Sequence, residues 1–173
     1  MRAGLLVLFL SLCALAAGCG SGQDEGSVTA HSRLPAPCRA NQLSIRDTGI
    51  GGVAAGTLSE SIEFRSAANC VLRGGPAVRL LSRSGGRLRA VRMARDTPVG
   101  PGVLLGKRPA YADLFYMNPG VRPKACRLEA YYMAISAARG MRTIKVRFRD
   151  APLRFCPGVI HASGYGYVPP QKP

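Results

Sequence analysis

The chain has 173 residues, with 24 lysine or arginine residues against 9 aspartate or glutamate residues, and a formal net charge of +15 at pH 7. This length leaves room for one ordinary domain with short tails and excludes a second domain of ordinary size. The positive charge predicts attraction to anionic surfaces through the summed field of the molecule.

The first 18 residues are predicted to be a signal peptide. Arg2 supplies a positive charge, and the 14 residues Leu5 to Gly18 form an uninterrupted apolar run. A membrane-spanning helix needs roughly 20 residues, whereas a shorter apolar run that ends in small residues is typical of a signal peptide. No later stretch approaches membrane-spanning length, so we expect an exported chain, and export argues against nucleic acid as a partner.

Cys19 is the predicted lipid attachment site. It follows Ala16, Ala17 and Gly18, a run of small residues similar to the bacterial lipobox, in which the cysteine thiol receives diacylglycerol and becomes the new N-terminus. Lipid attachment would place the chain on the extracytoplasmic face of the cell membrane. Ordinary signal cleavage, which would leave Cys19 as a free thiol, is the alternative. Cys13 falls within the discarded segment.

The remaining chain divides into three segments. Residues 19–37 are rich in glycine, serine and other polar residues and are expected to form a flexible tether. Residues 38–168 are the expected domain, and residues 169–173 are a tail. Removal of the signal peptide leaves 23 basic and 9 acidic residues, a net charge of +14.

Short runs of alternating polarity predict an all-β domain. Thr57–Phe64 alternates with a period of two, which is typical of a half-buried strand. Residues 129–138 could form a helix by propensity, but the preceding cysteine and the pair Tyr131 and Tyr132 favour a strand. Seven or eight strands separated by glycine and proline favour an antiparallel β-sandwich. The expected strands are residues 41–47, 57–64, two runs within 77–91 that flank a hairpin turn at 84–86, 110–117, 127–135, 142–148 and 158–167.

Four cysteines lie in the expected domain, and an exported chain permits disulfides between them. They are Cys38, Cys70, Cys126 and Cys156. Four cysteines allow three pairings. We favour the sequential pairing, which closes two loops of about 30 residues and stabilises the fold by roughly 3–4 kcal/mol for each loop.

The order of these cysteines and the motif around the second one resemble a known family. The segment NCVLRGGPAVRLL carries a Cys-x-Leu-x-Gly-x-Pro pattern at Cys70, Leu72, Gly74 and Pro76. It lies between an opening PAPCRANQLSI and the later segments KACRLEAYYM and LRFCPG. The chain thereby resembles the actinobacterial secreted lipoproteins called domain of unknown function 4232. The resemblance implies an immunoglobulin-like sandwich behind a signal peptide or lipobox, and it implies no catalytic residue.

Patterns that would indicate catalysis, metal binding or a cofactor are weak. His31 lies in the expected tether, and His161 lacks the two or three further ligands that a zinc site needs. The run GIGGVA at residues 49–54 matches a dinucleotide fingerprint, but an alternating strand follows it where that fingerprint needs a helix. We therefore expect no enzyme activity, no metal and no cofactor. A hydrolase hidden in the sandwich loops is a remaining hypothesis.

A basic surface is the strongest candidate for function. Its predicted residues are Arg79, Arg83, Arg87, Arg89 and Arg92. A plain solvated face is the alternative interpretation, and the six tyrosines offer a possible stacking platform. The sequence favours a non-enzymatic module that binds anionic envelope polymers or a protein partner. The alternative function is an accessory subunit or inhibitor of a membrane-associated enzyme or transporter.

Overall fold

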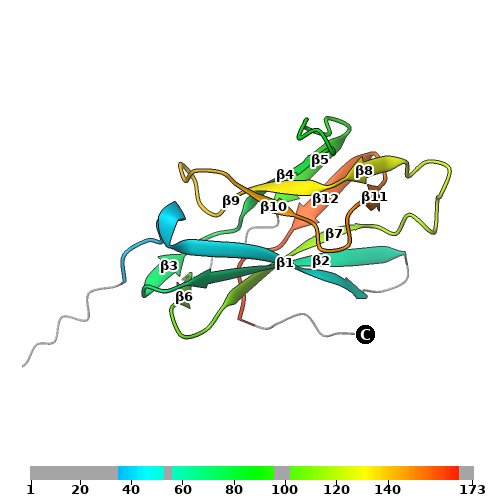
Figure 1. Ribbon diagram of the computed structural model, residues 1–173. Coiled ribbons are helices and arrows are strands. Elements are labelled where there is room, and N and C mark those ends of the chain that lie inside the picture. Colours follow the sequence, from blue (N-terminus) through cyan, green and yellow to red (C-terminus); the bar gives the residue numbers. More distant parts are fainter. Residues whose placement is uncertain (1–34, 53–55, 96–101, 168–173) are drawn as a thin grey trace, which may run out of the picture. The chain divides into compact units, whose positions relative to one another are not determined.

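The computed structural model describes residues 35–52, 56–95 and 102–167, coloured in Figure 1. Within these ranges the chain forms twelve β-strands and one short 3₁₀ turn, η1 (Ala40–Gln42). The predicted signal peptide, Cys19, most of the predicted tether and the predicted tail lie outside the described residues. The all-β prediction is confirmed.

The largest sheet has five strands in the order β1-β2-β7-β12-β5. These strands are β1 (Leu43–Gly52), β2 (Thr57–Ser66), β5 (Val91–Arg95), β7 (Ala110–Met117) and β12 (Gly158–Ala162). Neighbouring strands are antiparallel, except that β12 and β5 are parallel. The parallel pair departs from the predicted fully antiparallel arrangement.

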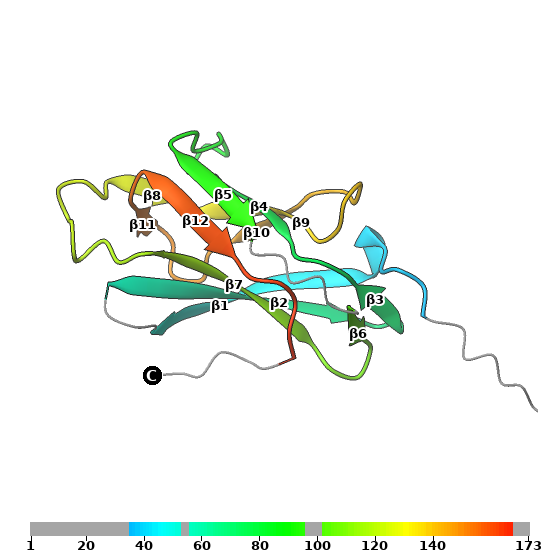
Figure 2. The ribbon, with the colours of Figure 1, turned by 180° about the vertical axis from the view of Figure 1, so that it is seen from behind.

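A three-stranded sheet in the order β10-β9-β4 forms a second layer. It consists of β4 (Ala77–Leu81), β9 (Tyr132–Ser136) and β10 (Ile144–Arg147). Two small sheets complete the fold, one from β3 (Cys70–Leu72) and β6 (Val103–Leu105), the other from β8 (Leu128–Ala130) and β11 (Leu153–Phe155). Figures 1 and 2 show β4, β9 and β10 above β1, β2 and β7, a sandwich-like arrangement consistent with an immunoglobulin-like fold.

The core lies between these layers. Ile62 and Phe64 of β2 and Leu114 of β7 are fully buried on one side, and Met133 and Ile135 of β9 are fully buried on the other. Each such side chain contributes about 1.5–3 kcal/mol when it leaves water. In β2 the alternation of Ile62 and Phe64 with polar neighbours is the reason that the strand was predictable from the sequence.

Strand β2 differs from the prediction in the burial of its second face. The face with Ser61 and Glu63 was expected to be exposed, yet both residues are almost completely buried. Strands β1 and β7 flank β2 on both sides. Arg46 from β1 and Tyr111 from β7 hydrogen-bond Glu63, and they cover this face. Long polar side chains of the neighbouring strands therefore bury a face that its own sequence marks as exposed.

The predicted hairpin is shorter than expected. Its turn is closed by a hydrogen bond from the Ser82 amide to the Gly86 carbonyl at 2.8 Å, and the Leu88 amide donates to Leu80. The second run then leaves this sheet, and β5 pairs with β12 in the other layer. The predicted strand at 127–135 is also divided, into β8 and β9.

The glycine-rich run at 49–54, which we expected to connect two strands, begins as part of β1. Its first four residues, Gly49 to Gly52, pair with β2, and residues 53–55 lie outside the described ranges. A β-bulge falls between Asp47 and Gly49, where Gly49 adopts a φ of +103°. Bulges favour glycine at such a conformation.

The sequential disulfide pairing is confirmed. Cys38 is bonded to Cys70, and Cys126 is bonded to Cys156. Backbone hydrogen bonds link the same segments, because the Cys38 amide donates to Val71 and the Val71 amide donates to Ala36. The first disulfide thus fixes the start of the described chain against β3.

Replacing Cys38 and Cys70 together by alanine should lower the free energy of unfolding by about 3–4 kcal/mol, because the bond closes a loop with a sequence separation of 32 residues. Denaturant unfolding of the wild type and the double variant measures this difference. A loss below about 1 kcal/mol would show that the packing of residues 36–38 on β3 is sufficient without the bond.

Candidate functional site

The outward side of the three-stranded sheet carries a group of basic side chains. The register places Arg79 of β4 opposite Ala134 of β9, and Ala134 opposite Lys145 of β10. Residues directly opposite each other in antiparallel strands share a face. Arg79 and Lys145 are exposed, so this row faces away from the core.

A second row runs beside the first. An isolated bridge pairs Arg87 with Leu81, which lies opposite Tyr132, and Tyr132 lies opposite Arg147. Arg87 and Arg147 are exposed at the two ends of this row. With strands about 4.8 Å apart, the row spans about 14 Å. We call the surface formed by Arg79, Arg87, Lys145 and Arg147 the basic face.

Tyr132 lies at the centre of the basic face. The Lys145 ammonium nitrogen is 3.8 Å from the centroid of the Tyr132 ring, a cation–π contact. Such contacts contribute roughly 0.5–1 kcal/mol at exposed sites. The contact places the ammonium group over the ring at an exposed position of the basic face.

The acidic residues that the structure describes lie outside the three strands of this sheet. None of these six residues belongs to β4, β9 or β10. Several have partners elsewhere: Asp113 accepts a hydrogen bond from Ser61, and Glu129 lies 4.0 Å from Arg154. Ion pairs among the described residues involve Arg46, Arg65 and Arg154, so no cation of the basic face belongs to one.

The structure separates the five arginines that were predicted as one surface. Arg79 and Arg87 belong to the basic face, Arg83 is exposed in the adjoining turn, and Arg89 is exposed after it. Arg92 lies on β5, opposite Val159 of β12, in the other layer. The chain crosses between layers after Arg89, so Arg92 belongs to a different sheet from Arg79.

Lys145 and Arg147 were absent from the predicted surface. A signal for them was present in the sequence, because Ile144–Arg147 alternates apolar and basic residues with the period of a strand. Its place in the same sheet as Arg79, with β9 between the two strands, could not be deduced from the alternation alone.

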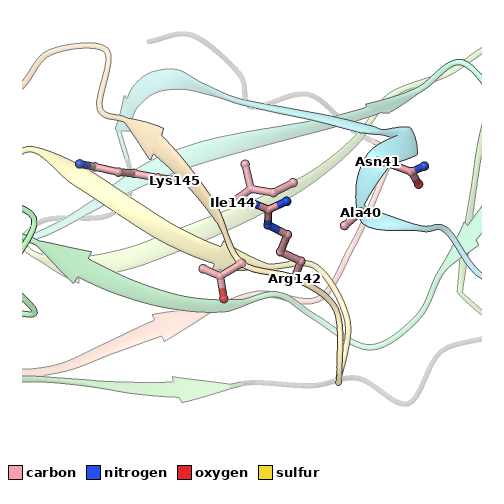
Figure 3. A pocket seen from close by; sticks show the side chains of 6 residues that line it. Ala40, Asn41, Arg142, Ile144 and Lys145 are labelled. Atoms are coloured by element: carbon pink, nitrogen blue, oxygen red, sulfur yellow. The ribbon is translucent and has the colours of Figure 1, made fainter.

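A hollow of about 530 Å³ adjoins the basic face between η1 and the start of β10, and Figure 3 shows it from close by. It is lined by Ala40, Asn41, Arg142, Thr143, Ile144 and Lys145. In Figure 3 Lys145 extends away from η1, whereas Arg142 and Ile144 lie toward it. The hollow therefore extends the basic surface by one guanidinium group.

The buried carboxylate of Glu63 is stabilised by hydrogen bonds from neighbouring side chains. Arg46 donates two hydrogen bonds to it, at 2.8 and 3.1 Å, and Arg65 and Tyr111 donate further ones. Burial alone would raise its pKa, but the hydrogen bonds from Arg65, Arg46 and Tyr111 outweigh burial and lower the pKa to about 2. Glu63 therefore remains ionised and stabilises the five-stranded sheet.

Glu60 lies on the opposite face of the same strand. It is completely buried, and within the described residues neither of its carboxyl oxygens has a hydrogen-bond partner. Burial, followed by the nearby carboxylates of Asp47 and Asp150, raises its pKa to about 10. Glu60 is thus protonated at neutral pH. Because Glu60 and Glu63 face opposite sides of a strand, they cannot flank one cleft, as glycoside hydrolysis would require.

His161 lies at an exposed position of β12. In the part of the chain that the structure describes, no group of three or more histidine, cysteine or acidic residues is arranged to hold a metal ion. Over the same residues, no helix has the length and hydrophobicity needed to cross a membrane.

The tyrosines do not form one platform. Tyr116 is buried against Phe155, and Tyr165 packs edge-on against Phe64 with ring centroids 5.0 Å apart. Tyr132 lies at the basic face, and Tyr167 is exposed near the end of the described chain. Most of these rings stabilise the sandwich.

Comparisons with protein families, with curated proteins and with solved structures find no match for this chain.

Glu60→Gln should change the pH dependence of stability. Unfolded Glu60 ionises above pH 4.5, whereas the folded form keeps its proton up to about pH 10. The wild type should therefore lose stability relative to the variant as pH rises through this window, by up to about 1.4 kcal/mol per pH unit. Denaturant unfolding of both proteins at pH 4, 6 and 8 measures the difference. A constant difference between the two proteins would contradict a protonated Glu60.

Proposed function

We propose that this protein is a non-enzymatic, exported lipoprotein that binds an anionic polymer of the cell envelope through its basic face. The observation that carries the proposal is the row pattern of Arg79, Arg87, Lys145 and Arg147 without a carboxylate among the strands that bear them. Four cations at strand spacing suit a partner that repeats its negative charge along a chain.

The chemistry of the side chains supports a polymer partner. Arginine presents planar donors that fit carboxylate or phosphate groups in pairs, and Lys145 adds a compact charge. The Tyr132 ring lies beneath that charge and gives the centre of the face an apolar surface. Individual exposed contacts are weak, so affinity would come from several contacts made along one chain.

The proposed membrane attachment rests on the N-terminal sequence. Two or three acyl chains on Cys19 would anchor the protein stably, because each buried CH₂ contributes about 0.8 kcal/mol. A flexible tether over residues 19–37 would have a root-mean-square span of about 25 Å. The domain could then contact polymers close to the outer side of the membrane. The resemblance to the domain of unknown function 4232 family agrees with this location.

The arrangement of the acidic residues supports a non-enzymatic role. Glu60 has no access to solvent, and Glu63 is neutralised by Arg46 and Arg65 on the other face of β2. General acid–base catalysis needs a titratable group within reach of a substrate. Neither glutamate meets this requirement.

Replacing Arg79 and Arg147 together by glutamine should weaken binding of long-chain inorganic polyphosphate about tenfold. Two exposed charge contacts of about 0.7 kcal/mol each give this factor. Isothermal titration calorimetry at low salt measures it. Binding by the wild type should also disappear in 1 M salt, where the screening length falls to about 3 Å.

The matched control replaces Arg92 and Arg122, which are exposed outside the basic face, by glutamine. This variant loses the same net charge. Equal weakening in both double variants would show that net charge alone is responsible, and the proposed face would be wrong. Partner binding that survives 1 M salt would favour an accessory subunit or inhibitor of a membrane protein instead.

The anchor is tested by intact mass measurement of the protein from a membrane fraction. A chain that begins at Cys19 and carries the mass of the lipid is expected. A soluble chain with an unmodified Cys19 would contradict the lipoprotein assignment, without affecting the binding measurement.

A further inference from the structure

A second hollow, of about 440 Å³, lies beside the small sheet of β3 and β6. It is lined by Asn69, Leu104, Leu105, Lys107, Arg108 and Tyr167. Its volume falls in the range of pockets that bind small molecules. We call it the Tyr167 hollow. None of its lining residues belongs to the basic face.

The ring of Tyr167 is held in place by the backbone of β6. Its hydroxyl accepts a hydrogen bond from the Leu104 amide at 2.8 Å and donates one to the Leu104 carbonyl at 3.0 Å. Both hydrogen-bonding functions of the hydroxyl are therefore used within the protein. Tyr167 nevertheless remains 44% exposed, and Leu104 remains 45% exposed. The result is a fixed aromatic surface open to solvent.

Charged and polar groups surround this ring. Lys107 and Arg108 are exposed in the turn between β6 and β7, and neither has an ion-pair partner among the described residues. Asn69 contributes an amide group to the same hollow. The Asn69 side chain lies against Gly106, whose φ of +149° a side chain would rarely adopt. Glycine at this position leaves room for the amide.

We propose that the Tyr167 hollow binds one anionic sugar unit, a saccharide that carries a carboxylate or a phosphate group. The C–H groups of a sugar ring would stack on the Tyr167 face, which carries partial negative charge. The acidic group would pair with the Arg108 guanidinium and the Lys107 ammonium group. Asn69 would hydrogen-bond sugar hydroxyls. The inference rests on the proposed function and identifies the envelope polymer as an acidic glycan.

A lipid surface is a less suitable occupant. Membrane-surface binding needs an apolar face that enters the headgroup region. Leu104 and Tyr167 are the exposed apolar residues of this site, and they border a hollow. A concave site with an aromatic wall and two cations suits a small ring better than a bilayer.

The test uses three probes that share one ring: glucose, glucuronic acid and glucose 6-phosphate. Titration of the purified full-length chain should shift the backbone amide signals of Leu104 and Lys107 with one or both acidic sugars, and at least tenfold more weakly with glucose. Tyr167→Ala should weaken binding of the acidic sugar at least tenfold. A second variant replaces the exposed Lys107 and Arg108 by glutamine, and it serves if Tyr167→Ala fails to fold. This double variant should bind glucose and the acidic sugars equally weakly.

The matched control replaces Arg122 and Lys124, exposed in the connection between β7 and β8, by glutamine and should bind as the wild type does. Equal binding of glucose and both acidic sugars would overturn the proposal. Inorganic phosphate that binds as tightly as glucose 6-phosphate would also overturn it, by indicating an ion site alone. Binding to anionic phospholipid vesicles that depends on Tyr167, in the absence of sugar binding, would likewise overturn the proposal.

Failure of this proposal is distinguishable from failure of the proposed function. Polyphosphate has no sugar ring, so its binding at the basic face should be unaffected by Tyr167→Ala. Polyphosphate binding without any sugar binding would contradict sugar binding at the Tyr167 hollow and support polymer binding at the basic face. Sugar binding without polyphosphate binding would contradict the basic face and support the Tyr167 hollow.

Discussion

The alternation of side chains in the three-stranded sheet determines which residues enter the core and which face solvent. Val78, Leu80, Met133, Ile135 and Val146 point inward and fill the core against the five-stranded sheet. The period of a strand then directs the residues between them outward. Replacing one of the larger inward residues by alanine would cost about 2–5 kcal/mol, so the core fixes the direction of the basic residues.

None of the acidic residues that the structure describes belongs to this sheet. Glu63 forms ion pairs with Arg46 and Arg65 in the five-stranded sheet. Asp47 accepts hydrogen bonds from the backbone amides of Gly49 and Arg149. Among the described residues, the four cations of the basic face therefore have no ion-pair partner. In our account the basic face would provide attraction along a polymer, and the Tyr167 hollow would provide selectivity for the chemistry of one unit.

Much of the fold followed from local patterns in the sequence. The segment Ala110–Met117, set off by proline and glycine turns, predicted β7 with its observed bounds, and the sequential pairing favoured for the four cysteines is the observed one. Burial of Glu60 was also implicit, because a period of two places it on the same face as Ile62. The strands of three residues, such as β3 and β6, are too short to show a period.

Other features depend on contacts between distant residues and left no local signal. The parallel pairing of β5 with β12 joins segments more than 60 residues apart, and it places Arg92 in a different sheet from Arg79. Tyr167 meets Leu104 across a separation of 63 residues. No pattern within either segment predicts the other as its partner, so the division of the arginines and the Tyr167 hollow required the structure.

In our proposal, the outward side of β4, β9 and β10 contacts an anionic polymer. Backbone amide shifts mapped during titration with long-chain polyphosphate test this contact residue by residue. We predict that the largest shifts fall on Arg79, Arg87, Lys145 and Arg147 and on the residues beside them. Shifts spread evenly over all exposed basic residues, or concentrated on β5 and β12, would contradict the claim.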